Sequence, residues 1–138
     1  MKELLILLRA MQLYSQNAHH LVKGMTFQQD HSFFSDVYED IADDYDSVAE
    51  RIIGMYGEEH LQLQPIMAGV VSKLAEAPST PTENNKVFYD YQLQLEESLC
   101  SLIEKIINAG VTPGIEQLIG EIANTSEMRK YKIKQRLK

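Results

Sequence analysis

The sequence predicts an all-α fold, a four-helix bundle with a short extra helix in the connection between the second and third long helices. Apolar residues recur at intervals of three and four residues in four long segments, which is the helical period. Glycine or proline stands at the boundaries of these segments, and no strand-like alternation is present. The 138 residues are 44% hydrophobic and 24% charged, which predicts a single domain over residues 1–138.

The first two long helices are predicted over residues 2–22 and 27–56. Gly24 supplies the stop of the first helix, because glycine readily adopts the left-handed conformation found after helix ends. Thr26, followed three residues later by Gln29, predicts a capping box for the second. The second helix carries a core-type apolar stripe and a softer stripe beside it, so we expect it to pack on two sides, one of them against another subunit. The softer stripe contains Tyr38, Ala42, Tyr45, Ala49 and Ile53.

The remaining helices are predicted from proline and glycine positions. A short helix is expected over residues 65–74, and a third long helix over residues 81–108, opened by Thr80 and Glu83 as a capping pair with proline at the first helical position. A fourth helix is expected from residue 113 to the C-terminus. One longer connection between the second and third long helices is typical of bundles with a crossover.

Two pairs of potential metal ligands are spaced along the first two helices. His19 and His31 stand twelve residues apart across the predicted turn, and Asp46 and Glu50 are four residues apart on the second helix. Imidazole nitrogens and carboxylate oxygens together suit a first-row metal such as iron or zinc. Because Asp46 lies fifteen residues beyond His31, the pairs are roughly 22 Å apart along the helix. One subunit therefore cannot close the site, whereas a two-fold dimer can join the histidine end of each copy to the carboxylate end of the other.

Plainer interpretations exist for these and other polar residues. The acidic residues of the second helix also fit a solvated face; they are Glu39, Asp40, Asp43, Asp44, Asp46 and Glu50. His60 is expected in an exposed loop. Cys100 lies on an apolar helix face and is predicted to be a buried, inert thiol.

The residues around the histidines resemble a known family. The run His19-His20-Leu21-Val22-Lys23-Gly24, the second histidine twelve residues after the first, and the D-x-x-x-E-R-I pattern at 46–52 are similar to the Dps mini-ferritins, the DNA-protecting proteins of starved cells. The resemblance implies a ferritin-like four-helix bundle. It also implies an inter-subunit ferroxidase centre with His19 and His31 from one subunit and Asp46 and Glu50 from the other.

The resemblance further implies an iron chemistry and an assembly. Ferrous iron would be oxidised by peroxide or dioxygen and stored as ferric mineral in a hollow dodecamer built from two-fold dimers, which limits oxidative damage. Zinc is a possible substitute for iron at the site.

Two positions depart from the family pattern. His20 stands where the family usually has a tryptophan, and the chain contains none. Ser35 stands where an acidic residue is often found, and it cannot supply a charged ligand. A metal site is therefore better supported than full ferroxidase activity. The alternatives are a non-catalytic, metal-stabilised helical assembly and a DNA-compacting protein with little ferroxidase activity.

Charge and cysteine content limit the cellular compartment and the binding partners that are expected. A single cysteine excludes an intrachain disulfide and predicts a reducing cytoplasm, and no stretch approaches the roughly 20 apolar residues of a membrane span. The net charge of −7 conceals a basic end without acidic residues. Its cations are Arg129, Lys130, Lys132, Lys134, Arg136 and Lys138. They predict either weak, sequence-independent DNA binding or a solvated last helix.

Overall fold

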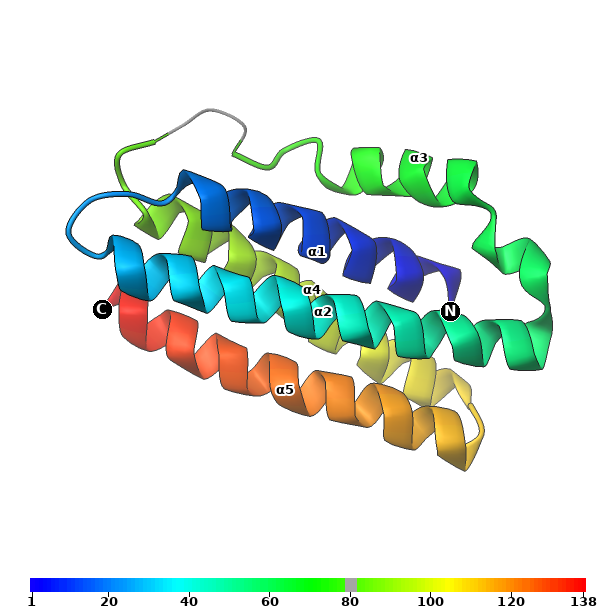
Figure 1. Ribbon diagram of the computed structural model, residues 1–138. Coiled ribbons are helices and arrows are strands. Elements are labelled where there is room, and N and C mark those ends of the chain that lie inside the picture. The colour runs from blue at the N-terminus through cyan, green and yellow to red at the C-terminus, as the bar shows by residue number, and fades with distance from the viewer. Residues whose placement is uncertain (79–81) are drawn as a thin grey trace.

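Four long helices form a bundle, and a short helix lies in the connection between the second and third of them (Figure 1). The computed structural model describes residues 1–78 and 82–138. The elements are α1 (Lys2–Leu21), α2 (Phe27–Tyr56), the 3₁₀ helix η1 (Glu58–Leu61), α3 (Leu63–Lys73), α4 (Lys86–Ala109) and α5 (Pro113–Leu137). The described residues contain no strand, so the predicted fold class is confirmed.

The bundle consists of two helical hairpins, α1 with α2 and α4 with α5, joined by the long connection that contains η1 and α3 (Figure 1). The core between them is apolar and comes from the predicted three- and four-residue stripes. Its largest fully buried side chains include Leu4, Leu8, Met11, Phe34, Ile41, Phe88, Leu99 and Ile103. In Figure 1 the C-terminus lies beside the turn between α1 and α2. The end of α5 therefore lies near the turn that separates His19 from His31, and Arg136 of α5 bonds to Thr26 and Asp30 there.

The helix boundaries at this turn agree closely with the sequence prediction, but the predicted cap does not form. Gly24 has φ +85° and α2 begins at Phe27. The Thr26 side chain caps no backbone N–H; its hydroxyl donates instead to Oδ2 of Asp30 at 2.7 Å. The capping box with Gln29 is therefore wrong, because a buried carboxylate is the stronger acceptor for the hydroxyl.

The start of α4 is the largest error in the helix predictions. The proposed signal at Thr80 and Pro81 lies outside the described residues, whereas residues 82–85 precede a helix that begins at Lys86. Thr82 Oγ1 accepts from the Asn84 backbone N–H, and Asn84 Oδ1 accepts from the Lys86 N–H. These side-chain bonds give the backbone an alternative to an earlier helical start.

The short helix α3 packs on the outer side of α1. Ile66 and Val70 are buried against Ala10, and Gly69 approaches Ile6 so closely that a Cβ there would clash. The helix begins at Leu63, two residues before the proline that was expected to open it. None of the helices in the described parts of the chain combines the length and the apolar character needed to cross a membrane.

Candidate metal centre

The structure brings His19 and His31 into direct contact across the turn. Their rings stack with centroids 3.6 Å apart and an interplanar angle of 20°. Nδ1 of His19 lies 2.7 Å from the carbonyl oxygen of His31, and Nδ1 of His31 lies 2.7 Å from the carbonyl oxygen of His19. A carbonyl oxygen can only accept, so both Nδ1 atoms carry hydrogen. In the neutral rings, each Nε2 is therefore left with a free lone pair.

These two bonds also complete the end of α1. The carbonyl of His19 belongs to the last turn of α1, where carbonyls lack a partner within the helix. The N–H of Lys23, which would reach it in a longer helix, donates instead to Oδ1 of Asn85 at 3.0 Å. The imidazole of His31 takes its place. Backbone acceptors thus fix the orientation of both rings, as they commonly do for metal-binding histidines.

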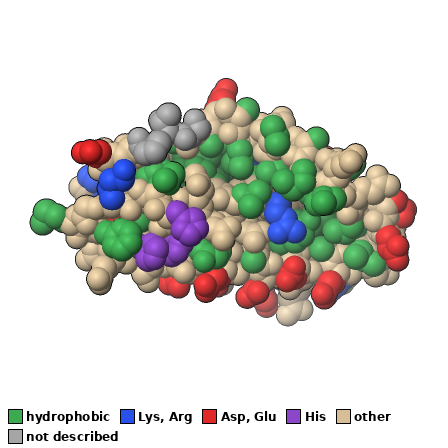
Figure 2. Space-filling model, turned by 45° about the horizontal axis from the view of Figure 1, so that its top comes forward, with side chains coloured by type: hydrophobic (Ala, Val, Ile, Leu, Met, Phe, Trp, Pro, Cys, Tyr) green, Lys and Arg blue, Asp and Glu red, His purple; other side chains and the backbone are tan. Residues whose placement is uncertain are grey.

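Aromatic rings enclose the pair on several sides. The Phe27 ring stacks on His31 with centroids 4.7 Å apart, and the Tyr38 ring meets His19 edge-on at 5.4 Å. His20 is exposed, with its ring 5.1 Å from that of His19. Figure 2 shows histidine side chains gathered among apolar ones on one face of the molecule, with acidic side chains along the edge of that face.

The predicted carboxylates lie elsewhere on α2. Asp46 and Glu50 are exposed, and neither has a hydrogen bond or ion pair with any described residue. Because α2 is unbroken between His31 and Asp46, about 22 Å of helix separates them. No group of three or more histidine, cysteine, aspartate or glutamate side chains able to hold a metal occurs in residues 1–78 and 82–138. Within one subunit, the histidine pair and the carboxylate pair therefore do not form a common site.

The buried carboxylates of the bundle are already neutralised by arginines of α5. Glu96 accepts from Nε and Nη2 of Arg129 at 2.8 and 2.9 Å. Asp30 accepts from Nε and Nη2 of Arg136 at 3.1 Å each. Both carboxylates are fully buried. Neither is free to bind a metal inside the bundle.

These pairs correct the interpretation of the basic C-terminal segment. Arg129 is buried and Arg136 is half-buried, so neither belongs to a solvated row of cations as predicted. The sequence did contain a signal for this, because both arginines continue the apolar stripe of α5 at helical spacing. That stripe runs through Ile115, Ile119, Ile122, Ser126, Arg129, Ile133 and Arg136. Lys132, Lys134 and Lys138 are exposed.

One member of the predicted acidic face also points inward. Burial raises the pKa of Asp44 to about 6; Arg129 lowers it, whereas Asp40 and Asp43 raise it further. Oδ2 of Asp44 is buried without a hydrogen-bond partner in the described structure. The solvated-face interpretation is therefore wrong for Asp44, although it describes the exposure of Asp46 and Glu50.

Two other candidates lie away from the histidine pair. His60 is exposed as expected, but it belongs to η1 rather than to an irregular loop. Cys100 is half-buried, and its Sγ lies 3.4 Å from the Ser126 hydroxyl oxygen. Neither lies in a group that could hold a metal within the described residues.

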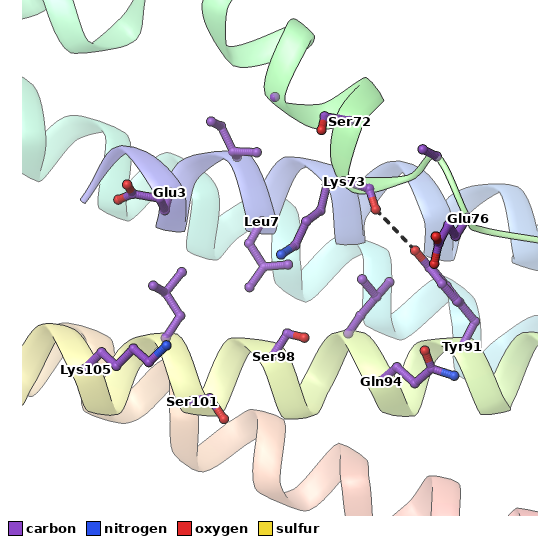
Figure 3. Close-up of a pocket in the computed structure, with 15 residues that line it drawn as sticks. Glu3, Leu7, Ser72, Lys73, Glu76, Tyr91, Gln94, Ser98, Ser101 and Lys105 are labelled. Atoms are coloured by element: carbon purple, nitrogen blue, oxygen red, sulfur yellow. Dashed lines mark hydrogen bonds between the residues drawn. The ribbon is translucent and has the colours of Figure 1, made fainter.

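A groove between α1, α3 and α4 offers mixed chemistry rather than a second centre (Figure 3). Leu7 and Leu95 contribute apolar surface, while Lys73 and Lys105 supply cations. The Tyr91 hydroxyl donates to the Lys73 carbonyl at 3.4 Å. The groove contains no histidine, and so it lacks the nitrogen ligands of the α1–α2 turn.

Comparison with known proteins supports the fold. No protein-family model matches the sequence, and no curated protein matches it. Among solved structures, the chain is similar to Dps92 from Deinococcus radiodurans, with a TM-score of 0.78 and 24% sequence identity. The match covers 97% of this chain and 81% of the Dps92 chain. The chain therefore has a Dps-like, ferritin-type fold, as the sequence predicted.

Proposed function

We propose that this chain is an iron-oxidising mini-ferritin that binds ferrous iron between two subunits. His19 and His31 of one subunit would act with Asp46 and Glu50 of the partner subunit. Iron oxidised there by peroxide or dioxygen would be stored as ferric mineral in a hollow oligomer. The observation that carries the proposal is the reciprocal bonding of the histidines, which leaves both Nε2 atoms available.

The stacked geometry favours two metal ions over one. A metal binds an imidazole nearly in the ring plane, about 2.0–2.1 Å from the nitrogen. Two rings that are stacked at 3.6 Å and tilted by only 20° have lone pairs that do not converge over such a distance. Each ring would therefore hold its own ion, as in a two-metal site. A carboxylate such as Glu50 of the partner subunit could bridge them.

The same geometry weighs against a purely structural zinc site. Structural zinc needs four ligands that converge tetrahedrally on one ion. His19 and His31 could share such an ion only if their stack opened and at least one Nδ1–carbonyl bond broke. A metal-stabilised assembly without oxidation remains the alternative against which the activity is tested.

Exposed apolar side chains supply a reason for pairing of subunits. Leu13, Ile53, Leu63 and Val71 are exposed on α1, α2 and α3, and apolar side chains surround the histidines in Figure 2. Burying such a surface is favourable. A two-fold axis across it would turn α2 of one copy against α2 of the other. We propose a closed homo-oligomer of such dimers, with twelve subunits the first expectation; a monomer in light scattering at micromolar concentration would contradict it.

The decisive measurement is oxidation of iron added to the purified protein. Ferrous iron is added anaerobically, then peroxide, and the ultraviolet rise of ferric oxo species is followed. Each iron gives one electron and peroxide accepts two, so we expect about two ferrous ions oxidised per peroxide at a two-metal site. The matched control is His60→Ala, which removes an exposed histidine elsewhere. An equal rise in the His19→Ala/His31→Ala double variant would refute the proposed centre.

The cytoplasmic location that the single cysteine suggests stays a prediction.

Ser35 is half-buried one turn after His31 and offers only a hydroxyl to a metal. We therefore expect one of the two ions to bind more weakly than the other, visible as two steps in the ferrous titration.

A further inference from the structure

A buried carboxylate next to His31 joins four parts of the molecule. Oδ1 of Asp30 accepts from the Tyr89 hydroxyl at 2.6 Å and from Nε of Arg136 at 3.1 Å. Oδ2 accepts from the Thr26 hydroxyl at 2.7 Å, from Nδ2 of Asn85 at 2.9 Å and from Nη2 of Arg136 at 3.1 Å. The α1–α2 turn, the start of α2, the start of α4 and the end of α5 are thus tied to one side chain.

Asn85 extends this network to the backbone of the turn. Its Oδ1 accepts from the Lys23 N–H at 3.0 Å, and its Nδ2 donates to the Lys23 carbonyl at 2.7 Å. If the Lys23 N–H were free, it could continue α1 by bonding to the carbonyl of His19, four residues earlier. Because Asn85 holds that N–H, the His19 carbonyl is left for Nδ1 of His31. Together with the extended backbone of Val22, the asparagine therefore keeps the His19 carbonyl open to His31.

We propose that Asp30, Asn85 and Arg136 are positioning residues for the histidine pair. They hold the Lys23 N–H away from the His19 carbonyl, so that His31 completes the end of α1 and both Nε2 atoms stay free of hydrogen bonds to the described residues. The expected effect on metal binding rests on the proposed function. The hydrogen position on each imidazole, however, is a property of the protein alone and can be measured without metal.

A second ion pair of the same kind provides the internal control. Arg129 and Glu96 join α5 to α4 through two buried hydrogen bonds, whereas Arg136 and Asp30 join α5 to α2. Neither Arg129 nor Glu96 bonds to the turn or to a histidine. Asn84 controls for Asn85 in the same way, since its side chain caps the Lys86 N–H but does not reach the turn. If the test changes acted only by destabilising the protein, the control changes should have the same effect.

The experiment compares Asn85→Ala and Arg136→Gln with Asn84→Ala and Arg129→Gln. Solid-state ¹⁵N NMR of the histidine-labelled, metal-free oligomer distinguishes Nδ1–H from Nε2–H rings, and a His31→Gln sample assigns the signals. Wild type and both controls should show His19 and His31 protonated at Nδ1. The two test variants should lose this state for His31. Cobalt titration, followed by visible absorption, should show affinity about tenfold lower in the test variants only.

The outcomes separate the two proposals. If wild type binds no cobalt or iron, the proposed function fails, while the NMR comparison still decides the positioning roles. If both test variants keep the Nδ1–H state, or if the controls lose it equally, the positioning proposal is overturned whatever the metal affinity. Should Arg136→Gln fail to fold, Asn85→Ala carries the test, because it leaves the Asp30–Arg136 pair in place.

Discussion

The two ends of α2 carry opposite kinds of candidate ligand site. At the N-terminal end, two imidazoles are held by hydrogen bonds and ring stacking before any metal arrives. Toward the other end, Asp46 and Glu50 are exposed and have no partner among the described residues. The histidine pair is thus organised within the subunit, whereas the carboxylate pair is not; in the proposed centre, the partner subunit would bring the two together.

The chemistry of the side chains explains this division. An imidazole has two nitrogens, so one can bond to the backbone while the other binds a metal. The two fully buried carboxylates, Asp30 and Glu96, are each paired with an arginine instead. A carboxylate paired in this way is not available to a metal, whereas Asp46 and Glu50 are exposed. In the proposed dimer, the partner subunit would bring these exposed carboxylates to the histidines.

The largest expected effect comes from placing a histidine substitution and a carboxylate substitution on different subunits. His19→Ala and Glu50→Ala should each lower iron oxidation by about a hundredfold or more, because each removes a ligand. When the two variants are co-assembled, random pairing makes half of the dimers mixed, and each mixed dimer keeps one intact site. Peroxide-driven oxidation should then recover to roughly one quarter of the wild-type rate.

A second mixture controls for this recovery. His19→Ala and His31→Ala damage the same end, so every site in their mixed dimers lacks one histidine, and no recovery is expected. Mass spectrometry should confirm that the subunits mix. Absence of recovery in the first mixture, despite mixing, would exclude a site shared in this way.

The free energy of unfolding should also depend more on the histidine end of α2 than on the carboxylate end. His31→Ala removes the cap on the His19 carbonyl and the stacked ring, and we expect the free energy of unfolding to fall by about 1–2 kcal/mol. Glu50 has no hydrogen bond or ion pair with a described residue, so Glu50→Ala should change the free energy of unfolding by about 0.5 kcal/mol or less. Urea unfolding at a fixed subunit concentration measures both. Equal losses would mean that the carboxylate end is also held within the subunit.

The sequence predicted the helices better than the contacts between them. Gly24 and Gly57 both adopt positive φ in the turns that follow α1 and α2, and the predicted ends of these helices lie within one residue of the observed ends. The start of α4 combines local and distant contacts. Thr82 and Asn84 bond to the backbone just before it, whereas the partners of Asn85, Lys23 and Asp30, lie 62 and 55 residues away. No local pattern contains the contacts of Asn85.

The candidate site shows the same limit. The short turn between two helices indicated that His19 and His31 lie close, and a straight α2 put Asp46 out of their reach. The reciprocal carbonyl bonds could not be predicted, because they need the Lys23 N–H to be diverted by another helix. Arg136 was placed among solvent-exposed cations because its buried partner, Asp30, belongs to a helix more than a hundred residues earlier.

Two carboxyl groups of α2 should give opposite pH dependence of stability. Burial raises the pKa of Asp44 to about 6. The unfolded chain has the ordinary value near 4, so ionised Asp44 costs stability above pH 6, and the cost disappears as the pH falls toward 4. After allowance for solvent at this partly exposed group, we expect Asp44→Asn to be about 1 kcal/mol more stable than wild type at pH 8. The difference should shrink as the pH falls from 6 and vanish below about pH 4 in urea unfolding.

Asp30 should behave in the opposite sense. Burial raises its pKa, but hydrogen bonds from Arg136, Tyr89, Thr26 and Asn85 outweigh this and lower it to about 2. Its stabilising contribution is present above about pH 4 and is lost as the pH falls through 2. An Asp30→Asn protein should therefore be less stable than wild type at pH 7 and approach it in acid. The same trend for both variants would contradict the contrast.

The smallest expected effect concerns DNA, at the histidine end of the bundle where α5 finishes (Figure 1). Two of the six predicted cations are engaged by Glu96 and Asp30, and the helix continues to Leu137. The net charge is −7, so the protein as a whole should repel DNA and oppose the attraction of the remaining lysines for phosphates. Added salt should weaken that attraction further. We expect at most a weak shift of plasmid in a gel at low ionic strength, and none at moderate salt. Changing Lys130, Lys132, Lys134 and Lys138 to glutamine should remove any shift; a strong wild-type shift that survives moderate salt would show that these lysines form a DNA-binding surface.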